Sequence, residues 1–272
     1  MQFAKINGVT IHHQVIGAAG KPLIVFANSL GTDFRIWRDV VVGLAGEFAV
    51  LLYDKRGHGL SSLGPKPTLS IEDHAADLIG LLEHLKLGPA TICGLSIGGM
   101  IAQAVWRDRP DLVTGLILCD TAHKIATREF WDARIEAVKQ ASVESIADAV
   151  MPRWFAPEFL KTAECEGYRT MLARQPVDGY LASCIALRDS DLTEAARSIG
   201  VPAVVVVGEH DGATPPALCA EFARLIPGAR FELIKNAGHI VPVEQPAMLT
   251  EIIRSFAALT EEGAIPDARQ RH

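Results

Sequence analysis

The chain has 272 residues and a formal net charge of −6, with acidic and basic residues mixed along its length. This length suits one α/β catalytic domain, and the charge offers no basic patch for nucleic acid or an anionic membrane. The five cysteines form no C-x-x-C pair, which argues against a disulfide framework and a zinc site. Because we find neither a signal-peptide pattern nor an apolar run of the ~20 residues that span a membrane, we expect a cytoplasmic protein.

The N-terminal part predicts strands that alternate with helices. Asn7-Gly8 suits a two-residue hairpin between strands at 3–6 and 9–15, which would edge the sheet. Continuous apolar runs at 23–27, 49–53, 90–93 and 116–119 are typical of strands covered on both faces. Helices are expected at 34–44, at 71–85 behind a variant capping box of Ser70 and Asp73, and from 100 onward.

From residue 121 to residue 197 this alternation stops, and helical periods with aromatic residues suggest a helical cap inserted over the sheet. The alternation resumes with strands at 203–207 and 231–234 and helices at 216–225 and 246–258. The pattern predicts an α/β fold with a mostly parallel, twisted sheet and helices on both faces. The predicted core spans residues 1–120 and 198–259, the cap residues 121–197, and a flexible tail residues 260–272.

The sequence GLSIGG, Gly94 to Gly99, lies between a predicted strand and a predicted helix. A G-x-S-x-G pattern in this context indicates a nucleophile elbow, in which small neighbours allow close packing and a strained turn exposes the serine hydroxyl. Ser96 is the candidate nucleophile, and the alternative is a glycine-rich turn with an incidental serine. The Ile97 amide would donate to an oxyanion, together with an amide of the loop after strand 23–27, from Leu30 or alternatively Ser29.

A serine nucleophile needs a base, and an acid that holds this base in the right tautomer. His239 follows the last predicted strand and is the candidate base, although a loop histidine satisfied by backbone is the alternative. Asp211 is the candidate acid because it follows strand 203–207 at its carboxyl end, and Asp120, which also ends a strand, is the alternative. His210 adjoins Asp211 and His272 is the terminal residue, so both are poorer candidates for the base.

One arginine of the predicted cap stands out. Arg134 shares a helix face with Trp131 and two aliphatic residues, which puts a cation inside an apolar stripe. Arginine is rarely buried unless it is paired. The spacing leaves two interpretations open: a salt bridge within the cap, to Asp189 or Asp191, or a guanidinium presented to a substrate carboxylate.

As a whole, these motifs resemble the α/β-hydrolase superfamily over nearly the entire chain. Within it the sequence is most similar to the 3-oxoadipate enol-lactonases, through FANSLGTD at 26–33, YDKRGHGLS at 53–61, CGLSIGGM at 93–100, LRDSDL at 187–192, GEHDGATPP at 208–216 and VEQP at 243–246. The NSLGTD segment is the most telling, because most members of the superfamily carry His-Gly where this chain has Asn28-Ser29. The final loop departs from the enol-lactonase pattern, with NAGH where AAH is usual.

The resemblance implies a serine hydrolase that opens a small anionic enol-lactone to 3-oxoadipate through an acyl-enzyme, in the breakdown of aromatic compounds. It implies no metal and no organic cofactor. Arg134, Trp131 and Ser29 would then bind the substrate. The alternatives are a carboxylesterase or a carbon–carbon bond hydrolase on the same scaffold, and, from a different class, a ligand receptor without turnover. The sequence does not predict the oligomeric state.

Overall fold

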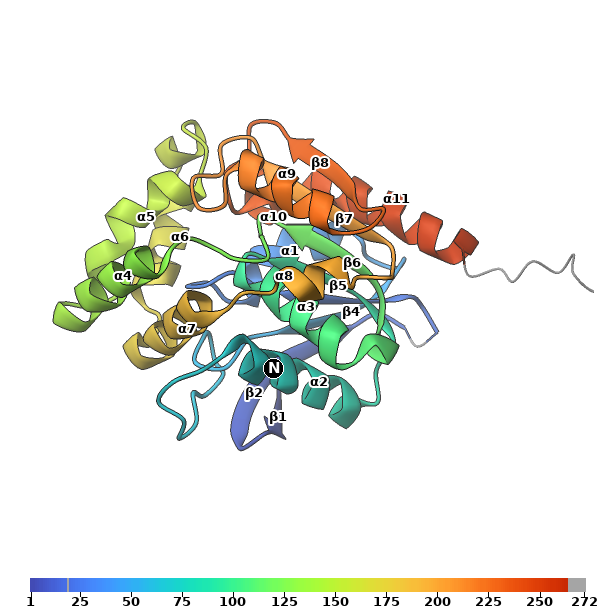
Figure 1. Ribbon diagram of the computed structural model, residues 1–272, viewed down its shortest axis with the longest axis horizontal. Helices are drawn as coiled ribbons and strands as arrows, with labels where there is room; N and C mark the ends of the chain where they lie inside the picture. Colours follow the sequence, from blue (N-terminus) through green and yellow to red (C-terminus); the bar gives the residue numbers. More distant parts are fainter. Residues whose placement is uncertain (19, 264–272) are drawn as a thin grey trace, which may run out of the picture.

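The computed structural model describes residues 1–18 and 20–263, and these residues form one sheet of eight strands (Figure 1). The strands are β1 (Gln2–Ile6), β2 (Val9–Ile16), β3 (Leu23–Ala27), β4 (Ala49–Tyr53), β5 (Ala90–Leu95), β6 (Val113–Cys119), β7 (Ala203–Gly208) and β8 (Arg230–Ile234). They lie in the order β1-β2-β4-β3-β5-β6-β7-β8. The pairs β1–β2 and β2–β4 are antiparallel, and all the others are parallel, which confirms the predicted fold class.

The predicted hairpin edges the sheet. Asn7 and Gly8 have φ angles of 49° and 80°, the left-handed conformation that a type I′ turn requires at both central positions. Ile6 therefore pairs directly with Val9. In the middle of the sheet, every residue of β5 and β7 is buried, as expected for strands that helices cover on both faces.

The helices that pack against the sheet form two layers. The α-helices are α1 (Arg38–Gly43), α2 (Ile71–Leu85), α3 (Ile97–Asp108), α4 (Arg128–Gln140), α5 (Ala147–Trp154), α6 (Ala163–Ala173), α7 (Val177–Asp189), α8 (Thr193–Arg197), α9 (Pro216–Leu225), α10 (Val241–Glu244) and α11 (Pro246–Gly263). The 3₁₀ helices are η1 (Phe34–Trp37), η2 (Pro110–Leu112), η3 (Glu144–Ile146) and η4 (Phe159–Lys161). In one layer α2 contacts α3, and α8 contacts both α3 and α9; in the other, α1, α10 and α11 contact one another.

Several boundaries differ from the prediction. The single helix expected at 34–44 is the 3₁₀ helix η1 followed by α1, because Asp33 accepts a hydrogen bond from the Arg35 amide and starts a tighter first turn. Strand β6 begins at Val113, which pairs with Ala90. Helix α10 was not predicted, and α11 continues to Gly263, the first glycine after residue 258, so residues 260–263 of the expected tail are helical. The rest of that tail, residues 264–272, lies outside the described residues.

Between β6 and β7, residues 120–202 are all described and contain helices but no strand. Four of these helices, α4 to α7, lie together beside the sheet, with α4 packed on α7 and α5 on α6 (Figure 1). We call α4 to α7 the inserted helices. Helix α8 contacts α3 and α9 instead, so residues 193–197, which the sequence placed in the cap, belong to the layer that covers the sheet.

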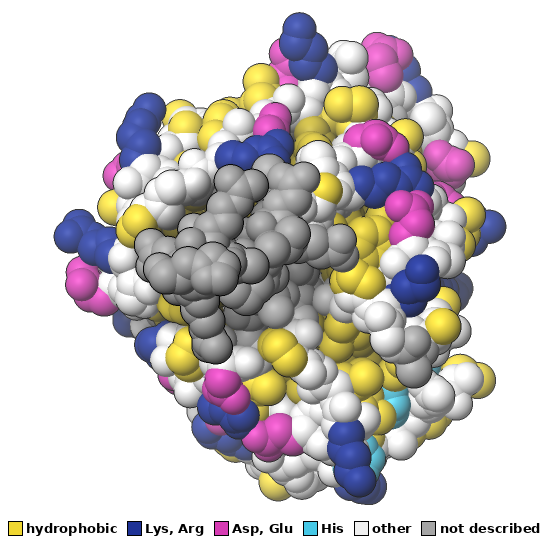
Figure 2. Space-filling model, turned by 90° about the vertical axis from the view of Figure 1, so that its right-hand side faces the viewer, with side chains coloured by type: hydrophobic (Ala, Val, Ile, Leu, Met, Phe, Trp, Pro, Cys, Tyr) yellow, Lys and Arg dark blue, Asp and Glu magenta, His cyan; other side chains and the backbone are white. Residues whose placement is uncertain are grey.

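On the face shown in Figure 2, basic and acidic side chains alternate over the surface outside the grey residues. Among the described residues, none of the helices combines the length and apolar character needed to cross a bilayer.

Candidate active site

Ser96 lies where β5 ends and α3 begins, and its backbone is strained. Its φ of 57° and ψ of −119° lie in a region that a residue with a side chain adopts only under constraint, at a cost of roughly 1–3 kcal/mol. Two neighbours impose this conformation: the Ser96 amide donates to the carbonyl of Cys119 at 2.9 Å, and Thr121 Oγ1 donates to the Ser96 carbonyl at 2.7 Å. The turn therefore has the geometry expected of a nucleophile elbow.

The glycines around Ser96 allow this tight turn. A Cβ atom at Gly94 would collide with the carbonyl oxygen of Gly98, and one at Gly98 would collide with the carbonyl oxygen of Ala27. Both obstacles are backbone atoms that cannot rotate away. Small residues at these two positions are thus a requirement for packing β5, α3 and β3 so closely.

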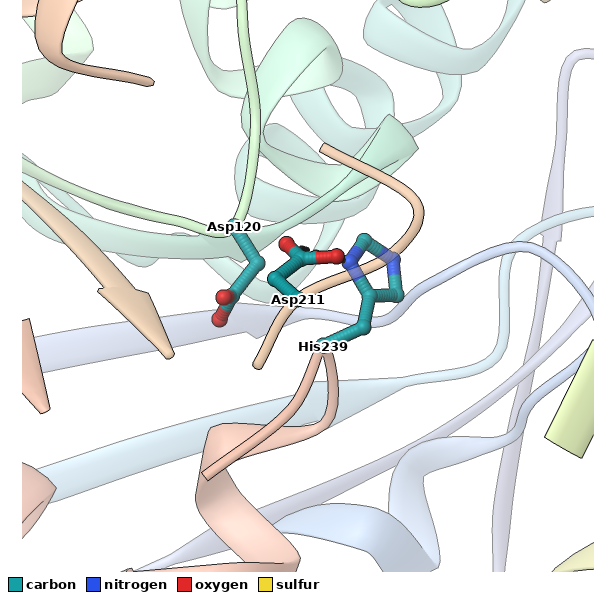
Figure 3. A group of neighbouring side chains, drawn as sticks. All are labelled: Asp120, Asp211 and His239. Atoms are coloured by element: carbon teal, nitrogen blue, oxygen red, sulfur yellow. Dashed lines mark hydrogen bonds and ion pairs between the residues drawn. The ribbon is translucent and has the colours of Figure 1, made fainter. Parts of the chain in front are cut away.

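His239 and Asp211 are joined as the sequence predicted, with 2.9 Å between His239 Nδ1 and Asp211 Oδ2 (Figure 3). Asp211 also accepts hydrogen bonds from the amides of Ala213 and Thr214 at 2.7 and 2.9 Å and from Thr214 Oγ1 at 2.6 Å. Burial raises the pKa of Asp211, but the attraction of His239 and these donors outweighs it, and the net pKa is lowered. An ionised Asp211 can only accept, so the proton lies on His239 Nδ1 and Nε2 is left as an acceptor.

The alternative acid, Asp120, lies beside Asp211 but has a different role (Figure 3). Its Oδ1 accepts a hydrogen bond from the Gly208 amide at 2.8 Å, and Oδ2 has no partner. Burial, and then the negative charge of Asp211, raise the pKa of Asp120 well above its ordinary value. Ligand atoms of Asp120, Asp211 and His239 lie within 4.8 Å of one another, but a neutral Asp120 and an engaged His239 Nδ1 are a poor donor set for a metal ion.

The loops that carry the base and the acid are both anchored to the end of α5. The His239 amide donates to the carbonyl of Trp154 at 2.7 Å, and the Gly212 amide, next to Asp211, donates to the carbonyl of Arg153 at 3.1 Å. These acceptors are carbonyls of the last helical turn, which have no partner within the helix itself. The inserted helices therefore help to set the positions of His239 and Asp211.

Glu244 adds a second brace between the same elements. Its carboxylate accepts from the Gly238 amide at 2.6 Å and from the Ala156 amide at 2.9 Å, so it links the histidine loop to the chain after α5. Burial raises the pKa of Glu244, while these two backbone donors act in the opposite direction. The sequence analysis used Glu244 only as part of the VEQP motif and did not assign it this function.

Of the two expected oxyanion donors, Ile97 follows Ser96 directly and Leu30 lines the cavity at Ser96. Ile97 is the first residue of α3, so its amide has no acceptor within the helix. Leu30 and Ser29, in the loop after β3, line the same cavity as Ser96 and His239. The structure thus gathers the predicted nucleophile, base and candidate oxyanion loop around one cavity.

The inserted helices also line this cavity and contribute two arginines to it. The Cζ atoms of Arg134 and Arg153 lie 5.2 Å and 5.0 Å from the ring centroid of Phe130. Both arginines also line the cavity with Ser96. Arg134 Nη1 donates to Tyr180 Oη at 3.2 Å. Trp131 is buried in the cavity wall, and its indole N–H donates to the carbonyl of Ile125 at 2.7 Å. The ring therefore presents an apolar surface to the cavity.

Neither arginine is neutralised. Asp189 pairs with Arg128 and Arg188, and Asp191 with Lys124, so the salt bridge considered for Arg134 within the cap does not form. Within residues 1–18 and 20–263, no carboxylate makes an ion pair with Arg134 or Arg153. Burial, followed by the like charge of Arg134, lowers the pKa of Arg153. Two unpaired cations at one cavity form a site suited to an anion.

Comparison with known proteins is consistent with this site. A model of the alpha/beta hydrolase family matches residues 24–252. The chain belongs to the alpha/beta hydrolase family. It is 31% identical over 249 residues to 3-oxoadipate enol-lactonase 2 of Acinetobacter baylyi, which covers 91% of this chain and 92% of that protein.

Solved structures agree with this assignment. This hydrolase superposes on the crystal structure of the enol-lactonase from Burkholderia xenovorans LB400 with a TM-score of 0.91 and 35% identity. The superposition covers 94% of this chain and 100% of the enol-lactonase chain. It superposes on a thermophilic esterase from Thermogutta terrifontis, solved with malate bound, with a TM-score of 0.88 and 30% identity, over 96% and 99% of the two chains. The resemblance to enol-lactonases is thus confirmed.

The hydrolase site contains one residue that the sequence analysis missed and could have found. Like Arg134, Arg153 has no acidic residue three or four positions away in either direction, so no neighbour on its own helix can neutralise it. Two such arginines among the aromatic residues of one helical segment are a signal for a shared anion site. His210 is half-exposed, lies near Glu209 and is not among the residues that line the cavity with Ser96, and His272 lies outside the described residues.

Proposed function

We propose that this hydrolase opens a small anionic enol-lactone, with 3-oxoadipate enol-lactone as its substrate and 3-oxoadipate as its product, in the breakdown of aromatic compounds. The observation that carries the proposal is the pair of unneutralised guanidinium groups, Arg134 and Arg153, in the cavity that Ser96 and His239 also line. A carboxylate held by these groups would place the lactone carbonyl toward Ser96. Similarity to two enol-lactonases along nearly the whole chain supports this choice of substrate.

In the proposed reaction, Ser96 Oγ attacks the lactone carbonyl while His239 Nε2 accepts the proton of the serine hydroxyl. Asp211 stabilises the imidazolium that forms. The oxyanion receives hydrogen bonds from the amides of Leu30 and Ile97, each worth ~3 kcal/mol of barrier. The ring C–O bond then breaks, and His239 gives its proton to the departing enolate oxygen, which leaves an acyl-enzyme with an open chain.

Water completes the cycle. His239 takes a proton from water, the resulting hydroxide attacks the acyl carbon, and Ser96 leaves with the proton returned by His239. The enol product tautomerises to the ketone, which gives a dicarboxylate. An enolate is a better leaving group than an alkoxide, so the main tasks of the protein are to orient the lactone and to stabilise charge. We propose that the inserted helices act as a cap that excludes bulk water from this reaction.

A carboxylesterase of small anionic esters is the second candidate, favoured by similarity to the esterase solved with malate bound. A panel of the enol-lactone, matched neutral and carboxylate-bearing aryl esters, and vinylogous diketones separates the candidates by kcat/KM. We expect the lactone to be preferred, and a preference for diketones would identify a carbon–carbon bond hydrolase instead.

The direct test follows the loss of enol-lactone absorbance with purified protein, using Ser96→Ala as the matched control. Labelling with a fluorophosphonate, followed by mass analysis of the peptide that contains Ser96, tests for an activated serine. Labelling without turnover of any ester or lactone would indicate a receptor, and lactone opening by the Ser96→Ala variant would refute the serine mechanism.

A further inference from the structure

A lysine without access to solvent is bonded to the loop that carries the candidate oxyanion donor. Lys55 follows β4 and is only 2% exposed. Its Nζ donates to the carbonyl oxygen of Ser29 at 2.6 Å. The same oxygen accepts from Thr32 Oγ1 at 2.9 Å and from the Thr32 amide at 3.4 Å.

This bond acts on Leu30 through the covalent structure of the chain. The carbonyl of Ser29 and the amide of Leu30 belong to one planar peptide unit, in which C=O and N–H point in opposite directions. A donor that fixes the oxygen therefore also fixes the direction of the N–H. A charged donor in addition polarises the unit, which makes the N–H a stronger hydrogen-bond donor.

Within residues 1–18 and 20–263, no carboxylate forms an ion pair with Lys55. The nearest carboxylates already have partners: Asp54 bonds His12 at 2.8 Å, and Asp33 bonds Arg35. Burial lowers the pKa of Lys55 to about 7, although the charges of Asp54 and Asp33 oppose this shift.

Two buried histidines, His58 and His74, lie close enough to Lys55 to feel its charge. Burial, and then the charge of Lys55, lower the pKa values of His58 and His74, so both remain neutral beside it. A buried ammonium group costs several kcal/mol of desolvation, and the one hydrogen bond that Lys55 Nζ makes within the described part of the chain is to the oxyanion loop.

We propose that Lys55 is a positioning residue for the oxyanion hole, whose ammonium group orients and polarises the Ser29–Leu30 peptide so that the Leu30 amide donates to the developing oxyanion. This inference rests on the proposed hydrolysis at Ser96, since it assigns Lys55 to the transition state of that reaction. It predicts an effect on kcat more than on KM, because the oxyanion forms only after the substrate is bound.

The first experiment compares Lys55→Met, which keeps the length and the apolar stem, with Thr32→Val, which removes a neutral donor from the same carbonyl oxygen. We expect Lys55→Met to lower kcat by about 10- to 100-fold with little change in KM, and Thr32→Val to lower it less. The wild-type kcat should fall above neutral pH as Lys55 loses its proton, and Lys55→Met should lack this alkaline limb. An unchanged kcat, or the same alkaline limb in both proteins, would overturn the inference.

The second experiment is independent of turnover, and its first measurement uses a protein that keeps Lys55. In the Ser96→Ala protein labelled with ¹⁵N-leucine, the Leu30 amide resonance should shift with pH around 7, and the shift should vanish when Lys55 is also replaced. A Leu30 resonance that does not respond to pH would refute the role of Lys55. If the Leu30 resonance shifts with pH but the wild-type protein opens no lactone or ester, the positioning role of Lys55 stands and the proposed function is rejected.

Discussion

Replacing Asp211 and Asp120 separately by asparagine tests which carboxylate serves His239. Asp211→Asn puts an NH₂ group or a carbonyl where Oδ2 now lies 2.9 Å from His239 Nδ1. The amides of Ala213 and Thr214 keep the Asn oxygen on the Oδ1 side, so the NH₂ faces the imidazole and reverses its tautomer. His239 Nε2 then carries a proton and cannot accept one from Ser96. In serine proteases the same change lowers kcat by about 10⁴, and we expect a loss of that order here.

Asp120→Asn should have little effect on kcat. Burial and the negative charge of Asp211 raise the pKa of Asp120 well above its ordinary value and so favour the neutral carboxyl group. Asparagine matches that group in shape and charge, and its oxygen can still accept from the Gly208 amide. We expect kcat within about threefold of wild type. Steady-state hydrolysis of the enol-lactone and of an aryl ester measures both variants, with thermal unfolding as a control. Equal losses in the two folded variants would refute the assignment of Asp211 as the acid.

Three further predictions follow from the site. Arg153→Met and Arg134→Met should each raise KM for the anionic lactone by about 10- to 100-fold, with little effect on a neutral aryl ester, whereas equal losses on both substrates would indicate structural roles. Gly98→Ala should lower the melting temperature, because its Cβ meets the Ala27 carbonyl, and unchanged melting would contradict the packing described here. Between pH 7 and the ordinary lysine pKa, the unfolded chain holds the Lys55 proton that the folded protein has released. The free energy of unfolding should therefore rise with pH more in the wild type than in Lys55→Met. Denaturant titrations over this pH range measure it, and an equal dependence on pH in both proteins would contradict a buried, titrating lysine.

The sequence predicts those features that depend on local pattern. Apolar runs identify β5 and β7, and the glycines that flank Ser96 identify the elbow, because each signal lies within one short segment. The contact between Asp211 and His239 was expected because a serine nucleophile needs such a pair, but the other contacts between distant segments were not predicted. The sequence could not choose between two interpretations of Arg134, since Asp189 meets Arg128 only where α4 packs against α7, and Asp191 meets Lys124, 67 residues away, only in the folded chain.

Lys55 illustrates the same limit. Its position inside YDKRGHGLS gives no hint that its side chain reaches back to Ser29, 26 residues earlier, because this contact exists only once β4 has paired with β3. Glu244 is similar: it becomes a brace only when α10 forms next to the end of α5. Long-range hydrogen bonds of this kind have no periodic signature in a single chain.

The anchoring of both catalytic loops to the end of α5 limits how the cavity can open. A swing of all the inserted helices as one rigid body would pull Trp154 from His239 and Arg153 from Gly212, and would dismantle the catalytic array each time a ligand entered. An opening that preserves the catalytic array must therefore leave the end of α5 in place. Arg153, in the last turn of α5, would then keep its place at the cavity, whatever movement α4 and Arg134 make.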